Sequence, residues 1–111
     1  MYAIVWRFLV KEDRRADFER HYGPEGRWAA FFRRDPAFVR TELLRGEGNE
    51  YVTLDYWSSK EAFLAFRAAH LAEYQEIDRG FEALTESETR IGDYVTVIQR
   101  PAIIPPKFGV Q

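Results

Sequence analysis

The stretch YVTLDYWSSKEAFLAFR, residues 51–67, changes from a strand-like pattern to the apolar repeat of a helix, and this change decides the fold. Up to Trp57 it is rich in β-branched and aromatic residues, which predicts a strand over 50–58. Ser58 stands three positions before Glu61, the spacing of a capping box that satisfies the first free amides of a helix. The helix predicted from here to residue 81 has an apolar stripe at spacings of three and four: Phe63, Phe66, His70, Tyr74, Ile77 and Phe81.

A second strand–helix unit precedes this one at the start of the sequence. YAIVWRFLV, residues 2–10, predicts a strand, and residues 13–22 then follow a helical period. Gly23 and Pro24 interrupt the helix, because proline lacks an amide proton and disfavours helical backbone in the preceding residue. Since proline suits the first turn of a helix, we expect a second helical segment over 24–34 and a bend between the two. The bend either opens a binding pocket or is only a kink in a packed core.

Two further strands complete the order of elements. Residues 38–46 predict a strand that forms a hairpin with 50–58, since the linking GEGN is short and rich in glycine. Residues 89–99 predict the last strand, with a bulge at Gly92. The order β-α-β-β-α-β is the ferredoxin-like arrangement of an α+β protein, with both helices on one face of a four-stranded antiparallel sheet. We expect it to form one domain over residues 1–100.

Two segments are not assigned to a helix or strand. The polar residues 85–88 predict a turn. The tail over 101–111 is rich in proline, which excludes it from the centre of a sheet. It carries Ile103, Ile104 and Phe108, which we expect to pack on the protein or on a partner.

The composition excludes several classes of function. Of the 111 residues 31% are charged, and the net charge of −2 argues against nucleic-acid binding, which needs a basic surface. The absence of cysteine excludes disulfides and thiolate metal sites. No apolar run reaches membrane-spanning length, and no signal peptide precedes the first strand, so we expect a cytoplasmic protein with neither membrane nor nucleic-acid partners.

Both faces of the predicted sheet are apolar. The first strand has Trp6 and Phe8 on one face and Val5 and Leu9 on the other, although helices cover only one face in this fold. A second copy packed sheet against sheet would cover the remaining face. We therefore expect a homodimer, with a monomer that exposes a few apolar side chains as the alternative.

Several segments together resemble the antibiotic biosynthesis monooxygenase (ABM) superfamily, and in particular its unassigned bacterial branch with a YGP-G-W element. They are WRFLVK, FERHYGPEGRWAAFFRR, TELLRG, YVTLDYWSSKEAFLAFR and LTESETRIG, spread over residues 2–98. The resemblance implies a dimeric α+β barrel of two ferredoxin-like protomers. Members include cofactor-independent oxygenases of polycyclic phenols, quinol monooxygenases and haem-degrading enzymes, so membership defines the fold better than the reaction.

A cofactor-free oxygenase needs an apolar pocket, a base that deprotonates a phenol and a polar group that holds the anion. We interpret His70 as the base, because it titrates near neutrality and lies on the apolar stripe, with Tyr74 one turn later as its hydrogen-bond partner. Arg7 is the candidate for stabilising the anion. The side chains expected to bind a small aromatic substrate are Tyr22, Trp28 and Phe66. The alternative for His70 is a hydrogen-bonded core residue.

Other chemistry is disfavoured by the residues at the relevant positions. Haem-degrading relatives use a first-strand Asn, a helical Trp and a His ligand, whereas this sequence has Trp6, Phe66 and a shifted His70. Neither metal-ligand nor phosphate-loop spacing is present, so no cofactor and no metal are expected. Asp55 is unusual in the middle of an apolar strand, and we expect it to pair with Arg40 across the hairpin. The remaining functions are a cofactor-independent monooxygenase acting on a phenol or quinol and a non-catalytic dimeric ligand-binding or accessory domain.

Overall fold

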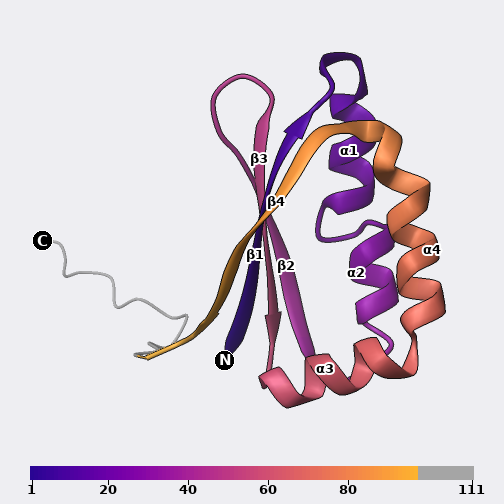
Figure 1. Ribbon diagram of the computed structural model, residues 1–111. Helices are drawn as coiled ribbons and strands as arrows, with labels where there is room; N and C mark the ends of the chain where they lie inside the picture. Colours follow the sequence, from indigo (N-terminus) through magenta and orange to yellow (C-terminus); the bar gives the residue numbers. More distant parts are fainter. Residues whose placement is uncertain (98–111) are drawn as a thin grey trace, which may run out of the picture.

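The structure, a computed structural model, describes residues 1–97 as a four-stranded sheet with helices on one face (Figure 1). The strands are β1 (Tyr2–Val10), β2 (Phe38–Arg45), β3 (Glu50–Trp57) and β4 (Thr85–Val95). The helices are α1 (Arg15–Tyr22), α2 (Arg27–Phe32), α3 (Lys60–Ala69) and α4 (Leu71–Phe81), with short 3-10 turns at Glu12–Arg14 and Glu82–Leu84. None of the helices in residues 1–97 has the length and apolar character needed to cross a membrane.

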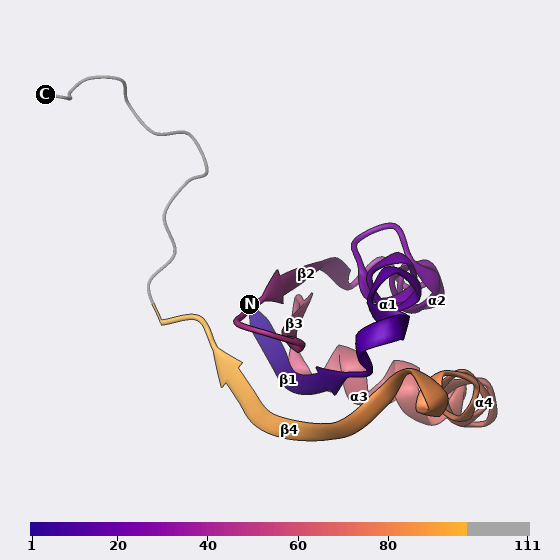
Figure 2. The same ribbon diagram turned by 90° about the horizontal axis from the view of Figure 1, so that it is seen from above.

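The strands lie in the order β2-β3-β1-β4, and every pair is antiparallel. This is the ferredoxin-like topology predicted from the order of elements. Figure 2 shows the curved sheet with the helices on one side of it and the other side open. The predicted tail over 101–111, with Ile103, Ile104 and Phe108, lies outside the described residues.

The predicted bend in the first helical arm is confirmed. The Gly23 amide donates to the Glu19 carbonyl and closes α1, and Gly26 caps α2. A Cβ atom on Gly26 would lie 2.4 Å from the His21 carbonyl oxygen, so only glycine allows this close approach. Pro24 was expected to open the second segment, but α2 begins at Arg27 and Pro24 lies in the connecting turn.

The second helical arm differs from the prediction in two ways. Its N-cap is Ser59, whose hydroxyl accepts from the Ala62 amide, because the Ser58 amide still bonds the Ala37 carbonyl at the strand end. The predicted single helix to residue 81 is two helices, since His70 has φ −123° and ψ 30°. Figure 1 shows α3 lying across the end of the sheet and α4 rising beside α1 and α2.

The last strand also begins earlier than predicted. Residues 85–88 were expected to form a turn, but they belong to β4, where Thr85, Ser87 and Glu88 pair with Val10, Leu9 and Phe8 of β1. Because β4 is an edge strand, polar side chains cost little there, and backbone pairing with β1 determines the conformation. The predicted bulge is confirmed: Gly92 pairs with Val5 and Arg90 with Trp6, leaving Ile91 as the extra residue.

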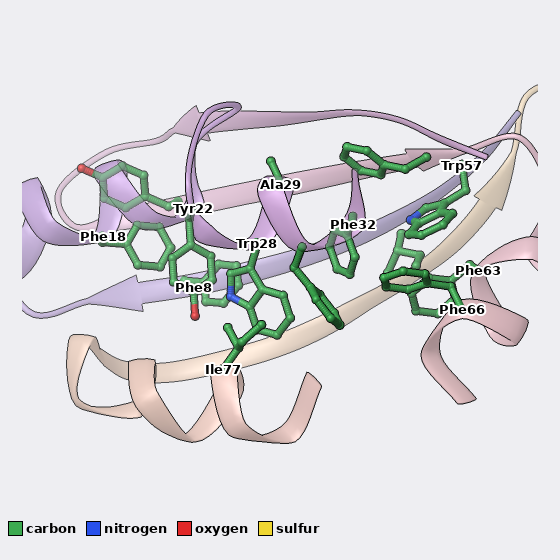
Figure 3. Close-up of a cluster of buried hydrophobic side chains, with 14 of the residues drawn as sticks. Phe8, Phe18, Tyr22, Trp28, Ala29, Phe32, Trp57, Phe63, Phe66 and Ile77 are labelled. Carbon is green, nitrogen blue, oxygen red and sulfur yellow. The ribbon is translucent and has the colours of Figure 1, made fainter. Parts of the chain in front are cut away.

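The core is a layer of aromatic side chains between the sheet and the helices. Figure 3 shows it extending from Phe18 and Tyr22 at the end of α1 to Phe63 and Phe66 on α3. Many of its rings meet edge to face, as Phe31 and Phe66 do with centroids 5.0 Å apart. The bulkiest side chains that it buries completely are those of Phe18, Phe31, Tyr51 and Trp57.

Candidate functional site

A cavity with two adjacent lobes lies between the helices and the covered face of the sheet. The lobes measure about 170 and 370 Å³. Residues that line both lobes are Trp6, Phe32, Asp55, Arg67 and Tyr74. The smaller lobe continues toward α4 and β4, and the larger one toward α3 and β4. Aromatic walls with a few polar groups are typical of a site for a small organic ligand.

Small polar residues on β2 and β3 leave room for this cavity. Thr41 and Thr53 are buried on the covered sheet face, where neighbouring positions carry large aromatic rings. The bend at Gly23 and Gly26 places Tyr22 and Trp28 on successive helices, and both side chains line the smaller lobe. The predicted bend therefore accompanies a cavity and is more than a kink in a filled core.

Asp55 lies half-buried on the floor of both lobes. Its Oδ1 atom accepts a hydrogen bond from the Thr41 hydroxyl at 2.5 Å, since the two residues are opposite each other in β3 and β2. Within residues 1–97 no basic nitrogen lies within 4.0 Å of the carboxylate. Burial raises the pKa of Asp55 to about 6, and the hydrogen bond from Thr41 opposes this shift. Such a carboxyl can accept a proton from a ligand near neutral pH.

The predicted pairing of Asp55 with Arg40 is wrong. A register shift between Phe38 and Arg40 places Arg40 opposite Tyr56, on the open face of the sheet. There its guanidinium carbon lies 4.2 Å from the centroid of the Tyr56 ring. A bulge in an edge strand reverses the faces of the residues that follow it, and sequence alternation alone did not reveal this one.

Arg67 and Tyr74 line both lobes together with Asp55. The Arg67 guanidinium carbon lies 4.9 Å from the centroid of the Tyr74 ring, so α3 and α4 meet through a cation–π contact. Burial raises the pKa of the Tyr74 hydroxyl, and hydrogen bonding with Arg67 opposes the shift. Tyr74 is therefore a neutral hydrogen-bond donor at physiological pH, beside a permanent positive charge.

The end of the smaller lobe is acidic. Asp78 of α4 and Glu88 of β4 line it together with Tyr22 and Trp28. Burial raises the pKa of both carboxyls, and repulsion from the Glu82 carboxylate adds to the shift. The indole Nε1 of Trp28 is buried and has no hydrogen-bond partner among the described residues. This end can bond a ligand hydroxyl, which both donates and accepts.

Three of the predicted site residues meet in the cavity: Tyr22, Trp28 and Tyr74. Phe66 supports the wall from behind, with its ring centroid 5.4 Å from that of Trp57, but it does not line either lobe.

His70 and Arg7 lie elsewhere. His70 is at the α3–α4 junction, where its Nδ1 atom is 3.2 Å from Arg34 Nη2 and its ring is 4.6 Å from that of Phe66. It shares only a backbone hydrogen bond with Tyr74, because the break in the helix turns its ring away from the cavity. Arg7 pairs with Glu50 and lies on the opposite side of β1 from Trp6 and Phe8.

Sequence reasoning missed Asp55, Arg67 and Trp6 as cavity residues. The signal for Asp55 was present, since an acid between apolar neighbours in a strand is uncommon. Arg67 stands beside the apolar stripe and gave no signal of its own. In the described part of the chain, no group of three His, Asp or Glu side chains is placed to hold a metal ion.

The fold and the cavity define a ferredoxin-like α+β domain with a ligand-sized site between its helices and its sheet. A sequence model of the antibiotic biosynthesis monooxygenase family matches residues 1–77. The chain belongs to this family, as its sequence resemblance predicted.

Solved structures agree with this assignment. SnoaB from Streptomyces nogalater, a cofactor-independent oxygenase, is 31% identical over 90% of this chain and 96% of that chain. The TM-scores are 0.71 for a point mutant of SnoaB and 0.70 for a second SnoaB structure. A protein of Nitrosomonas europaea, provisionally assigned to the antibiotic biosynthesis monooxygenases, has a TM-score of 0.63 at 15% identity over 88% of this chain and 100% of that chain, and it shares the fold. No curated protein matches the chain.

Proposed function

We propose that the protein is a cofactor-independent monooxygenase acting on a small electron-rich aromatic compound, a phenol or a quinol. The observation that carries this proposal is an aromatic cavity that contains one carboxyl group with a pKa near neutrality. The similarity to SnoaB supports the same class of reaction.

The reaction balances without an external reductant. A phenol and one O₂ molecule give a quinone and one water molecule: one oxygen atom enters the ring as a carbonyl and the other leaves as water. The substrate supplies all four electrons, so the protein has to bind the ring, favour the phenolate and exclude bulk water. Deprotonation is the first requirement, because a phenolate gives up an electron more readily than a phenol does.

The cavity residues suit these tasks. Trp6, Trp28 and Phe32 supply flat walls for a planar ring. Arg67 and Tyr74 supply a positive charge and a hydroxyl for the developing oxyanion. A cavity of about 150 Å³ holds one benzene molecule, so each lobe is large enough for one substituted ring.

Oxygen consumption tests the proposal. Purified protein is freed of metals by chelation and of flavin by dialysis, and O₂ uptake is measured with a panel of monocyclic and fused-ring phenols and quinols. We expect uptake that depends on both the protein and the substrate, with one labelled oxygen atom in the product when ¹⁸O₂ is supplied. Failure of every compound in the panel to support uptake would contradict the proposal.

A matched pair of arginine variants ties turnover to the cavity. Arg67→Met removes the positive charge of the wall but keeps an extended side chain, and we expect kcat/KM to fall by about 10²-fold. Arg79→Met is the control, because Arg79 is an exposed residue of α4 that lines neither lobe. Equal activity of the two variants would contradict the assignment of the site.

The alternative function is ligand binding without chemistry. It predicts quenching of tryptophan fluorescence by an aromatic ligand, since Trp6 and Trp28 line the cavity, with no O₂ uptake. The open cavity, which Phe66, Tyr74 and Trp28 do not fill, leaves space for a reacting molecule and favours the enzyme.

We further propose that the functional unit is a homodimer. The face of the sheet that the helices leave open carries Val5, Leu54 and Tyr56 near its centre, with the exposed Leu44 and Tyr94 on its flanks. An apolar surface of this kind on a sheet indicates a partner. A second copy of the chain, placed sheet against sheet, is the partner that the face suits.

A further inference from the structure

We propose that Asp55 is the general base of the site, held in place by Thr41, and that it takes the proton from the hydroxyl group of a bound phenol. This inference rests on the proposed function and adds the residue that starts the chemistry. It replaces His70, which lies outside the cavity.

The position of Asp55 suits a general base. Among the described residues, Asp55 is the only carboxylate that lines both lobes, so a ring bound in either lobe lies beside it. The other carboxylates of the cavity, Asp78 and Glu88, are confined to the end of the smaller lobe. Reach toward the abstracted proton is the first requirement of a general base.

One oxygen of the Asp55 carboxylate remains available to a ligand. Thr41 donates to Oδ1, and within residues 1–97 Oδ2 accepts no hydrogen bond and pairs with no basic group. The Thr41 bond fixes the orientation of the carboxyl group. A carboxylate with one fixed and one free oxygen in a cavity is arranged to accept a proton from a ligand.

The charged groups around the cavity also suit proton transfer to Asp55. The titratable and charged groups that line the cavity together with Asp55 are Tyr22 of α1, Arg67 of α3, Tyr74 and Asp78 of α4, and Glu88 and Arg90 of β4. Desolvation dominates over these groups in raising the pKa of Asp55, so the carboxyl is ionised above about pH 6 and remains basic enough to accept a proton. Arg67, the only cation of the described chain that lines both lobes, is placed to stabilise the phenolate that results.

The proton step is balanced. The O–H bond of the phenol breaks, the proton moves to Asp55, and the electron pair stays on the phenol oxygen. The phenolate then reduces O₂, and one oxygen atom bonds to a ring carbon, which loses its hydrogen as a proton when it becomes a carbonyl. That proton and the proton held on Asp55 both end on the oxygen atom that leaves as water. Asp55 ends the cycle ionised, as it began.

The pH dependence of kcat/KM is the main test. For the wild-type protein we expect activity to rise with pH through about 6 and then reach a plateau, because the base acts only when it is ionised. Asp55→Asn keeps the shape and the acceptor for Thr41, so it should fold, but we expect kcat to fall by about 10²- to 10⁴-fold. The rise near pH 6 should disappear from its residual activity.

Two further variants separate a base from a structural residue. Thr41→Val removes the hydrogen bond that favours the ionised carboxyl, so the rise in activity should shift to higher pH while the plateau survives. Asp55→Glu keeps the acid and should recover part of the activity lost in Asp55→Asn. An unchanged profile in Thr41→Val, or full activity in Asp55→Asn, would overturn the proposal.

A binding experiment distinguishes failure of this proposal from failure of the proposed function. The probe is 4-nitrophenol, whose phenolate is yellow, titrated while bound to the wild-type protein and to Asp55→Asn. An ionised carboxylate beside the probe raises its pKa, so we expect the bound probe to ionise at higher pH in the wild-type protein. Equal titration in the two proteins, or no binding to the wild-type protein, overturns the role of Asp55. A shifted titration without O₂ uptake for any substrate supports the contact and overturns the oxygenase alone.

Discussion

Replacement of Asp55 by asparagine should make the folded protein more stable at neutral pH while it removes activity. Burial raises the pKa of Asp55 from 3.8 to about 6 in the folded protein. As pH rises from about 4 to 6, the unfolded chain loses this proton before the folded chain does, so the carboxyl destabilises the fold increasingly. A shift of about 2 units corresponds to about 3 kcal/mol above pH 7, an upper value because the cavity admits water.

Asparagine carries no such cost and still accepts the Thr41 hydrogen bond. We expect Asp55→Asn and wild-type protein to differ little in this contribution to stability below about pH 4. Above pH 7 the variant should gain up to about 3 kcal/mol, which for a chain of this length is roughly 13 °C in melting temperature. The assay is urea unfolding and thermal melting at half-unit steps from pH 4 to 8, at one protein concentration.

Asp93 provides a control, because its ionised carboxylate has the opposite effect on the stability of the fold. The hydrogen bond from Tyr2, with Lys60 and Arg90 nearby, lowers the pKa of Asp93, so its charge favours the fold at neutral pH and this effect is lost as pH falls. Asp93→Asn should therefore be less stable than the wild-type protein at pH 7. A stability difference for Asp55→Asn that stays constant from pH 4 to 8 would refute the reasoning about Asp55.

Three further predictions concern the rest of the molecule. Light scattering at micromolar concentration should give the mass of two chains, and Leu54→Glu on the open sheet face should reduce it to one; a wild-type monomer would rule out the dimer. Gly26→Ala should lower the free energy of unfolding by roughly 2 kcal/mol, since its Cβ would lie 2.4 Å from the His21 carbonyl oxygen. Gly80→Ala, with open space around it, is the control and should be neutral or stabilising; equal melting temperatures of the two variants would contradict the packing at the bend. Titration with haemin should give no stoichiometric shift of the Soret band, because His70 lies outside the cavity, and a tight one-to-one complex would overturn that expectation.

The architecture followed from local patterns in the sequence. The ferredoxin-like order followed from the change between strand and helical periods in YVTLDYWSSKEAFLAFR and from the same change near the N-terminus. The bent first arm followed from the break at Gly23 and Pro24. Tyr22, Trp28 and Tyr74 were recognised as pocket residues for a related reason. Their positions beside the bend or on the apolar stripe direct large rings toward the sheet.

Only the tertiary structure decided which polar groups enter the cavity. The register shift after Phe38 turns Arg40 to the open face and leaves Asp55 with Thr41. The break at His70 removes that histidine from the stripe and brings Arg67 against Tyr74. Residues 85–88 form part of β4 because β1 offers them a pairing partner, although their side chains are polar. In each case backbone geometry governed by contacts distant in sequence overrode the local pattern. The periods of 2.0 and 3.6 residues describe only uninterrupted elements, so they could not anticipate these changes.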